Sequence, residues 1–366
     1  MDRKNGIKDP YLGSAQNVLK HIKLHVAALQ GDLETAKKYG DDLQLPITQN
    51  GETALHIAIL AGQKEFVKKL VEWFGMPILE IQDEKGNDAL SYAARIGSLD
   101  MVNVIVDVRE SIYPSLKSKK KALLKAASLG HTDITKRLSK LIDLQLLEDE
   151  EARRLYVYCV EMGLYGLATK MHTRHQICLA PAQEVSALCV LARQPSAFSD
   201  ESQSSGLFNR FARLCGKFIG RENSNHSDHA LQIVTKFWEL DEEAQTSSTK
   251  EIENSLFIAA EVGNVDFIIK LIGLNPNLLW TIDKEKGSIF HVAVQHRQEK
   301  IFSLLLQLGG IKEILAKFIT ASDRNSLLHL VAELPPDPEK LNTVCGAALQ
   351  LHRELVWFKV KLIHTA

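Results

Sequence analysis

Residues 51–62 read GETALHIAILAG, and this stretch decides the fold. Its apolar residues recur at helical spacing, and Gly62 stands where a short helix would end. Glycine adopts the left-handed conformation without a steric penalty, so it suits the residue that follows a helix. The stretch therefore predicts a short helix that carries one polar residue, His56, inside an apolar run.

The same pattern returns at a nearly fixed interval. Helix-ending glycines occur at 31, 62, 97, 130 and 163, in steps of 31, 35, 33 and 33 residues. Each is preceded four residues earlier by a small residue and followed by a second apolar segment, such as FVKKLVEW at 66–73. Each interval thus predicts two short helices, and because neither buries its apolar face alone, neighbouring units must stack.

Three of these segments carry a family resemblance. TALHIAILAG (53–62), DALSYAARIG (88–97) and KLHVAALQG (23–31) resemble the T-P-L-H-x-A pattern of the ankyrin repeat. The predicted fold is all-α, an ankyrin-repeat solenoid of two arrays separated by an irregular linker. In that family the histidine hydrogen-bonds within and between neighbouring repeats, so the resemblance implies structural roles for His25, His56, His291, His329, Gly31, Gly62, Gly97, Gly130, Gly163 and Gly263.

The second half of the chain repeats the pattern after an interruption. The phase is lost after Gly163, returns at residues 254–272, continues at 287–305 with Arg297 in the glycine position, and ends at 324–334. The predicted domains are an N-terminal tail (1–18), a first array of about five repeats (19–175), a linker (176–250), a second array of about three repeats (251–334), and a Pro-rich turn with an amphipathic helix (335–366).

The linker contains two distinct segments. Residues 194–206 are polar and are predicted to be disordered. Residues 206–220, GLFNRFARLCGKFIG, predict a short basic amphipathic helix docked between the arrays. A membrane-surface helix and a calmodulin-target helix are the alternatives for this segment.

The C-terminal region indicates which group of ankyrin-repeat proteins the sequence resembles. Residues 341–359 predict a helix with an apolar stripe, Leu341, Val344, Ala348, Leu351, Leu355 and Phe358, which we expect to cap the second array. Two ankyrin arrays followed by NSLLHL, a proline-rich turn and GAALQLHRELVWFK resemble plant ankyrin proteins with a C-terminal PGG domain, relatives of the accelerated-cell-death and salt-tolerance proteins. That family carries membrane-spanning helices, whereas this sequence has no PGG motif or apolar span. A soluble isoform, a truncated gene model and a loss of the anchor remain open.

Composition and motifs argue against several classes of function. Lys and Arg number 44 against 45 Asp and Glu, so the net charge of −1 attracts neither nucleic acid nor anionic lipid. Five cysteines without a CxxC pair predict reduced thiols in the cytoplasm. No phosphate loop, GxSxG, HExxH or kinase motif is present, so we assign no catalytic residue and no cofactor.

Two clusters have a structural explanation. His172, His175, Cys178 and Cys189 have spacings that zinc uses, but the histidines suit a solvated helix end, so we assign no metal site. The run KSKKK at 117–121 reads as the solvated turn before the fourth repeat rather than as a nuclear signal.

The expected function is that of a non-enzymatic protein-interaction scaffold in plant stress or defence signalling. The alternative is the cytosolic part of a membrane-associated regulator of signalling or transport, at the cytosolic face of the plasma membrane, with membrane contact indirect or through a missing domain. The sequence does not set the oligomeric state. Protein partners are expected on the concave surface, and the candidate contact residues, at turn tips and helix ends, are Gln49, Asn50, Glu52, Leu60, Glu84, Lys85, Asn87, Arg95 and Ile96.

Overall fold

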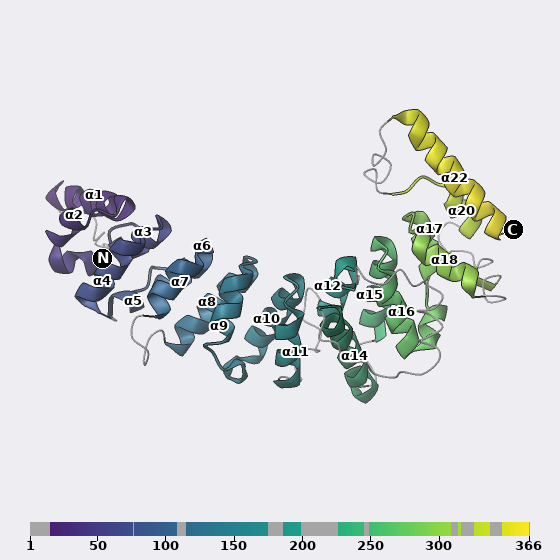
Figure 1. The fold of residues 1–366 in the computed structure, drawn as a ribbon, viewed down its shortest axis with the longest axis horizontal. Coiled ribbons are helices and arrows are strands. Elements are labelled where there is room, and N and C mark those ends of the chain that lie inside the picture. Colours follow the sequence, from purple (N-terminus) through teal and green to yellow (C-terminus); the bar gives the residue numbers. More distant parts are fainter. Residues whose placement is uncertain are drawn as a thin grey trace, which may run out of the picture. The chain divides into compact units, whose positions relative to one another are not determined.

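The fold consists of helix pairs in two compact units, Met1–Tyr158 and Cys159–Ala366 (Figure 1). A computed structural model describes residues 15–75, 77–107, 115–174, 186–198, 226–244, 249–308, 314–315, 326–336 and 346–365. None of the helices in these segments is both long enough and apolar enough to cross a bilayer.

In the first unit, the first helices of successive pairs pack on one another. They are α1 (Ala15–Gln30), α3 (Ala54–Leu60), α6 (Ala89–Ile96) and α8 (Leu116–Ser128). The first helix of the next pair is α10 (Asp149–Glu161), which contains the boundary with the second unit. The second helices are α2 (Leu33–Lys37), α4 (Lys64–Phe74), α7 (Leu99–Val106) and α9 (Thr132–Ser139). Short elements between pairs are η1 (Gly40–Gln44), α5 (Pro77–Glu80) and η2 (Leu144–Leu146).

Small side chains let the first helices approach closely. Ala27, Ala58, Ala93 and Ala126 occupy the same position in successive pairs and are at most 2% exposed. Larger apolar side chains such as Phe66 fill the space between first and second helices. Burial of such side chains stabilises each pair by roughly 1.5–3 kcal/mol per large residue, so the stack supplies the core that a single pair lacks.

A recurring hydrogen bond, here called the clasp, ties four of the helix pairs to the pair before them. The residue after the helix-ending position reaches back to a carbonyl near the end of the preceding first helix. The clasps are Gln63 Nε2 to Leu29 O (2.8 Å), His131 Nε2 to Arg95 O (3.2 Å), Gln194 Nε2 to Glu161 O (3.0 Å) and Gln298 Nε2 to Glu261 O (2.7 Å). A Cβ on Gly97 would lie 2.6 Å from His131 Cε1, so this glycine is needed for space as well as for its φ of 80°.

The second unit has the same construction. Its first helices are α12 (Ala187–Ala192), α15 (Thr249–Val262), α17 (Ile289–Gln295) and α20 (Leu327–Ala332), and its second helices are α11 (Tyr165–Arg174), α14 (His226–Ala244), α16 (Val265–Leu274) and α18 (Glu299–Gln307). The remaining elements are η4 (Pro195–Ala197), η5 (Pro276–Trp280), the antiparallel pair β1 (Ile282–Asp283) and β2 (Gly287–Ser288), and α22 (Ala347–Thr365).

A further helix pair, α12 with α14, lies in the region that the sequence assigns to a linker. α12 packs against α15, α14 packs against α11 and α16, and Gln194 forms its clasp in the usual place. The spacing of helix-ending glycines does not predict this pair, because Arg193, with a right-handed φ of −78°, occupies the glycine position. In addition, residues 199–225 separate the two helices. The predicted amphipathic helix at 206–220 lies outside the described residues.

α22 packs on α20 at the end of the second unit (Figure 1). Arg297 makes this contact: its Nε and Nη2 donate to Glu354 Oε2 at 3.0 and 2.8 Å, and its guanidinium lies 5.3 Å from the Trp357 ring centre. The predicted apolar stripe is not the docking face, since Leu351 is 62% and Leu355 48% exposed. A polar contact from the arginine in the glycine position therefore orients the helix.

Candidate functional site

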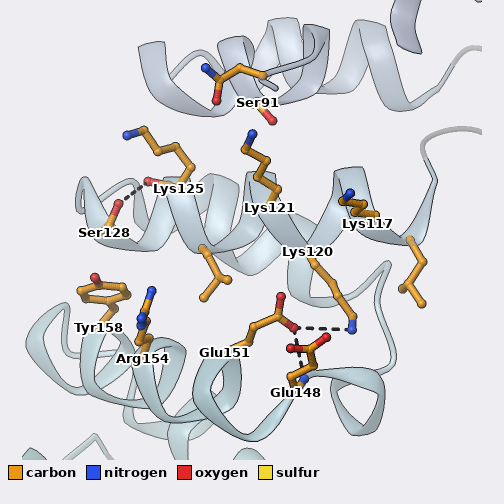
Figure 2. Close-up of a pocket in the computed structure, with 13 residues that line it drawn as sticks. Ser91, Lys117, Lys120, Lys121, Lys125, Ser128, Glu148, Glu151, Arg154 and Tyr158 are labelled. Carbon is orange, nitrogen blue, oxygen red and sulfur yellow. Dashed lines mark hydrogen bonds and ion pairs between the residues drawn. The ribbon is translucent and has the colours of Figure 1, made fainter. Parts of the chain in front are cut away.

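A groove of about 730 Å³ opens over α6, α8 and α10 in the first unit (Figure 2). Its wall on α8 carries four lysines, and its wall on α10 carries Arg154 and Tyr158. The lining residues are Asn87, Ser91, Leu116, Lys117, Lys120, Lys121, Leu124, Lys125, Ser128, Glu148, Glu151, Arg154 and Tyr158. Five basic side chains against two acidic ones give the groove a local positive charge that the overall net charge of −1 conceals.

The basic side chains lie in the groove because α8 begins early. Ser115 caps this helix by accepting a hydrogen bond from the Ser118 backbone at 3.3 Å, and α8 has 13 residues against 7 in α3. The run KSKKK is therefore helical, and its interpretation as a solvated turn is wrong. Because residues four apart share a helix face, Lys117, Lys121 and Lys125 form one row.

The groove lysines differ in how far their charges are satisfied. Lys120 pairs with Glu151 at 3.5 Å. Lys121 donates to the backbone carbonyls of Lys85 (3.3 Å) and Gly86, which are neutral acceptors. Within the described segments, the ammonium groups of Lys117 and Lys125 have no hydrogen-bond or ion-pair partner. Three of the four lysines thus lack an acidic partner there.

Ser91 adds a buried hydroxyl to the groove. This residue is 3% exposed, and its Oγ finds no hydrogen-bond partner in the part of the chain that the structure describes. Figure 2 shows its side chain on the α6 side, facing Lys121. A buried polar atom left unpaired costs about 1–3 kcal/mol, so a ligand oxygen at this position would recover free energy.

Two predicted contact residues, Glu52 and Asn87, form hydrogen bonds that stabilise the turns. Glu52 accepts hydrogen bonds from Thr48 Oγ1 at 2.9 Å and from Tyr92 Oη at 2.8 Å. Asn87 donates through Nδ2 and its backbone to Asp83 at 2.9 and 2.7 Å. Although burial opposes ionisation of Asp83, the hydrogen bonds from Asn87 hold its pKa below the ordinary value.

The other predicted contact residues are at the surface. Gln49, Asn50, Glu84 and Lys85 are exposed at the turn tips, and the Glu84 backbone donates to Asn50 O at 2.9 Å, linking neighbouring turns. At the helix ends, Leu60 is 40% and Ile96 38% exposed. Arg95 lies with its guanidinium 4.4 Å from the centre of the Tyr92 ring. Only Asn87 of the predicted set lines the groove.

Three of the predicted structural histidines cap helices. The Nδ1 atoms of His56, His291 and His329 accept hydrogen bonds from the backbones of Thr53, Ser288 and Ser326 at 3.1, 3.2 and 3.3 Å. His25 forms no such cap, because α1 begins ten residues before it. The six predicted structural glycines all have positive φ, between 71° and 90°.

The considered zinc residues do not form a site in the described part of the chain. His175, Cys178 and the side chain of His172 lie outside the described residues, and burial raises the pKa of the Cys189 thiol. No cluster of His, Cys, Asp and Glu suited to a metal ion occurs in the described segments.

Comparison with known proteins supports the repeat assignment. Residues 24–115 match the family model "Ankyrin repeats (3 copies)". The chain is 35% identical over 91 residues to "Transient receptor potential cation channel subfamily A member 1 homolog" of Caenorhabditis elegans, a match that covers 24% of this chain and 7% of that protein's length. The helix pairs and the match of residues 24–115 to the family model define an ankyrin-repeat fold.

Two solved structures are similar to the chain. The ankyrin repeat domain of Bcl-3 is 18% identical, with a TM-score of 0.38 over 47% of this chain and 80% of that one. The human ASB11 ankyrin repeat domain is 20% identical, with a TM-score of 0.33 over 78% of this chain and 97% of that one.

Proposed function

We propose that this protein is a non-enzymatic scaffold that binds a segment of a partner protein in the groove over α6, α8 and α10. The observation that carries the proposal is a hollow of about 730 Å³ in which two lysine ammonium groups and a buried hydroxyl have no partner in the described segments. Stacked repeats hold such side chains on a rigid framework, which keeps the entropy cost of binding low.

The exposed residues of the predicted contact set form the rest of the proposed contact surface. Gln49, Asn50, Glu84 and Lys85 supply polar groups at the turn tips, while Leu60 and Ile96 supply apolar ones at the helix ends. Glu52 and Asn87 contribute indirectly, because their hydrogen bonds keep the turns in place.

The proposed setting is the cytoplasm of a plant cell, in stress or defence signalling. It is supported by the resemblance to the PGG-domain ankyrin family and by five cysteines without a CxxC pair. The second candidate is a membrane-associated regulator of signalling or transport. The order of elements in the PGG-domain family favours this second candidate. The similarity to a short part of a protein named as a cation channel also favours it.

A steric block of the groove tests the binding proposal. Ser128 lies in the groove and Ser139 on α9, and each hydroxyl donates to a backbone carbonyl three residues earlier at 3.0 Å. A library of displayed random peptides is selected on the full chain, and the winners are tested against Ser128→Trp and its matched control, Ser139→Trp. We expect binding to be lost only in Ser128→Trp. Peptides that bind both variants equally well would refute the proposal.

A further inference from the structure

We infer that the groove selects an acidic segment of the partner, in extended conformation, with carboxylates at alternate positions along the chain. The inference rests on the proposed function, because it names the chemistry of the ligand of the same groove. It follows from the charges left open on α8, from one buried hydroxyl, and from a match between two repeat distances.

The first step is the charge of the α8 wall. Lys117 and Lys125 have no partner within the described segments, and Lys121 donates only to neutral carbonyls among the contacts described. A hydrogen bond between an ammonium and a carboxylate is roughly twice as strong as a neutral one. The three lysines of this row therefore favour a ligand that brings negative charge to each of them.

The second step concerns Ser91. Its hydroxyl is buried, has no hydrogen-bond partner among the described residues and faces Lys121, so a hydrogen-bond donor and an ammonium converge on one position (Figure 2). A ligand carboxylate there accepts from both groups. Occupation of this position removes the cost of the unpaired hydroxyl and gives Lys121 a charged acceptor.

The third step is geometric. Lys117, Lys121 and Lys125 are four residues apart, and at a rise of about 1.5 Å per residue they recur every ~6 Å along α8. In an extended peptide, side chains two residues apart lie on the same side at a spacing of ~6.6 Å. Alternate acidic residues therefore meet successive lysines, while the residues between them face the α10 wall, which carries Tyr158.

The groove fits a peptide better than it fits a nucleic acid or a membrane. Glu148 and Glu151 line the opposite side and repel a ligand that is negative on all sides. A membrane surface is flat and does not enter a hollow between helices. A single strand with acidic groups along one edge satisfies the lysine row without approaching the two glutamates.

Fluorescence anisotropy on the full chain tests the inference. The probe is a fluorescein-labelled 12-residue peptide of alternating Glu and Ser; the comparison peptides replace Glu by Gln, or place the same number of Glu residues in one block. We expect the alternating peptide to bind about tenfold more tightly than the Gln peptide and more tightly than the block peptide, a tenfold change being 1.4 kcal/mol.

Matched variants locate the site. Lys117→Glu with Lys125→Glu reverses two charges in the groove, and Lys136→Glu with Lys140→Glu makes the same change at α9. We expect the first pair to weaken binding by about tenfold or more and the second to leave it within about twofold. Ser91→Ala should weaken binding of the Glu peptide by about threefold without destabilising the fold, because the hydroxyl has no hydrogen-bond partner in the described segments.

The outcomes separate this inference from the proposed function. If Gln and Glu peptides bind equally and Ser128→Trp blocks both, the groove binds peptides but does not select acid, and the inference is wrong. If vesicles with a quarter of phosphatidylserine bind through the lysine row while the peptides do not, a membrane surface replaces the peptide. A phosphoserine version of the probe distinguishes phosphate from carboxylate, and its binding in place of the Glu peptide would overturn the assignment to carboxylates.

Discussion

The imidazole of His56 stabilises the start of α3 only in its neutral form. Its Nδ1 accepts a hydrogen bond from the Thr53 backbone, so this nitrogen must be unprotonated, and the ring proton lies on Nε2. The ring is fully buried, with its centroid 4.7 Å from that of Tyr92, whose own burial and hydrogen bonds to Asp83 and Glu52 raise its pKa. The histidine is thus a structural group at the centre of a polar cluster.

Replacing His56 should destabilise the first unit without any effect on ligand charge selection. His56→Ala removes the acceptor for Thr53 and leaves a buried N–H unpaired, so we expect a loss of about 1–3 kcal/mol in the free energy of unfolding. Urea denaturation followed by circular dichroism measures it. His25→Ala is the matched control, since His25 is half-buried and caps nothing; equal losses in the two variants would contradict the capping role.

The contribution of His56 should also depend on pH. Burial lowers the pKa of His56 below its ordinary 6.5, although Asp83 and Glu52 act in the opposite direction. The unfolded chain therefore takes up a proton at a pH where the folded chain does not, and stability falls as the pH drops below about 6.5. The contribution is fully present above that pH. We expect the stability difference between wild type and His56→Ala to be smaller at pH 5 than at pH 8; an unchanged difference would mean that His56 does not titrate differently on folding.

Among the helix pairs, Arg297 occupies the position of a helix-ending glycine and also binds α22 through its side chain. It is the one non-glycine residue with positive φ, 59°, in the described segments. A left-handed residue with a side chain is strained by roughly 1–3 kcal/mol, and the hydrogen bonds to Glu354 and to the Glu333 carbonyl offset this strain. The side chains of Arg297 and Glu354 are only 10% and 16% exposed, so their interaction is weakly screened by solvent.

Loss of the ion pair between Arg297 and Glu354 should weaken the packing of α22 on α20. Glu354→Gln removes the charge on which two donors of Arg297 converge, and hydrogen bonds to charged groups contribute about 1.5–3 kcal/mol. We expect faster hydrogen exchange in residues 346–365, while exchange in α3 and α6 stays unchanged. Arg297→Gly should have the same effect on α22 even though it relieves backbone strain. His352→Gln, on an exposed position of the same helix, is the control, and faster exchange there as well would contradict a specific role for the pair.

The same elements show what the sequence could predict and what it could not. The periodic glycines and alanines predicted the helix pairs, because backbone conformation and close packing act locally and repeat. The docking face of α22 could not be predicted, since an ion pair with a residue 57 positions away outweighed the apolar stripe. The groove was missed because Lys117–Lys121 was treated as a turn. The Ser115 cap and the absence of Gly or Pro up to Leu129 were the signals that α8 starts early.

Across the second unit, the long segment between α12 and α14 interrupts a helix pair whose two helices both pack on neighbouring pairs. Residues 197 and 198 are buried before that segment begins, with Phe198 against Phe267 at 5.7 Å between ring centres. α12 then contributes to the stack from one side of the segment, and α14 from the other. Asn264 donates to the carbonyls of Leu191 and Ala192 at 3.2 Å, which ties α12 to the helix pair that follows.

Proteolysis tests this arrangement. The sequence predicts residues 194–206 as the first site of cleavage, but residues 194–198 are ordered at η4. The expected cut is therefore at Glu201, where protease Glu-C should cleave before it cuts residues 50–110. Each fragment then holds one partner of two packed pairs, α12 with α15 and α11 with α14. We expect the nicked protein to elute as one species in size-exclusion chromatography and to separate into two fragments only in denaturant. Two peaks under native conditions would show that the covalent connection, rather than the packing of the interrupted repeat, joins the two sides.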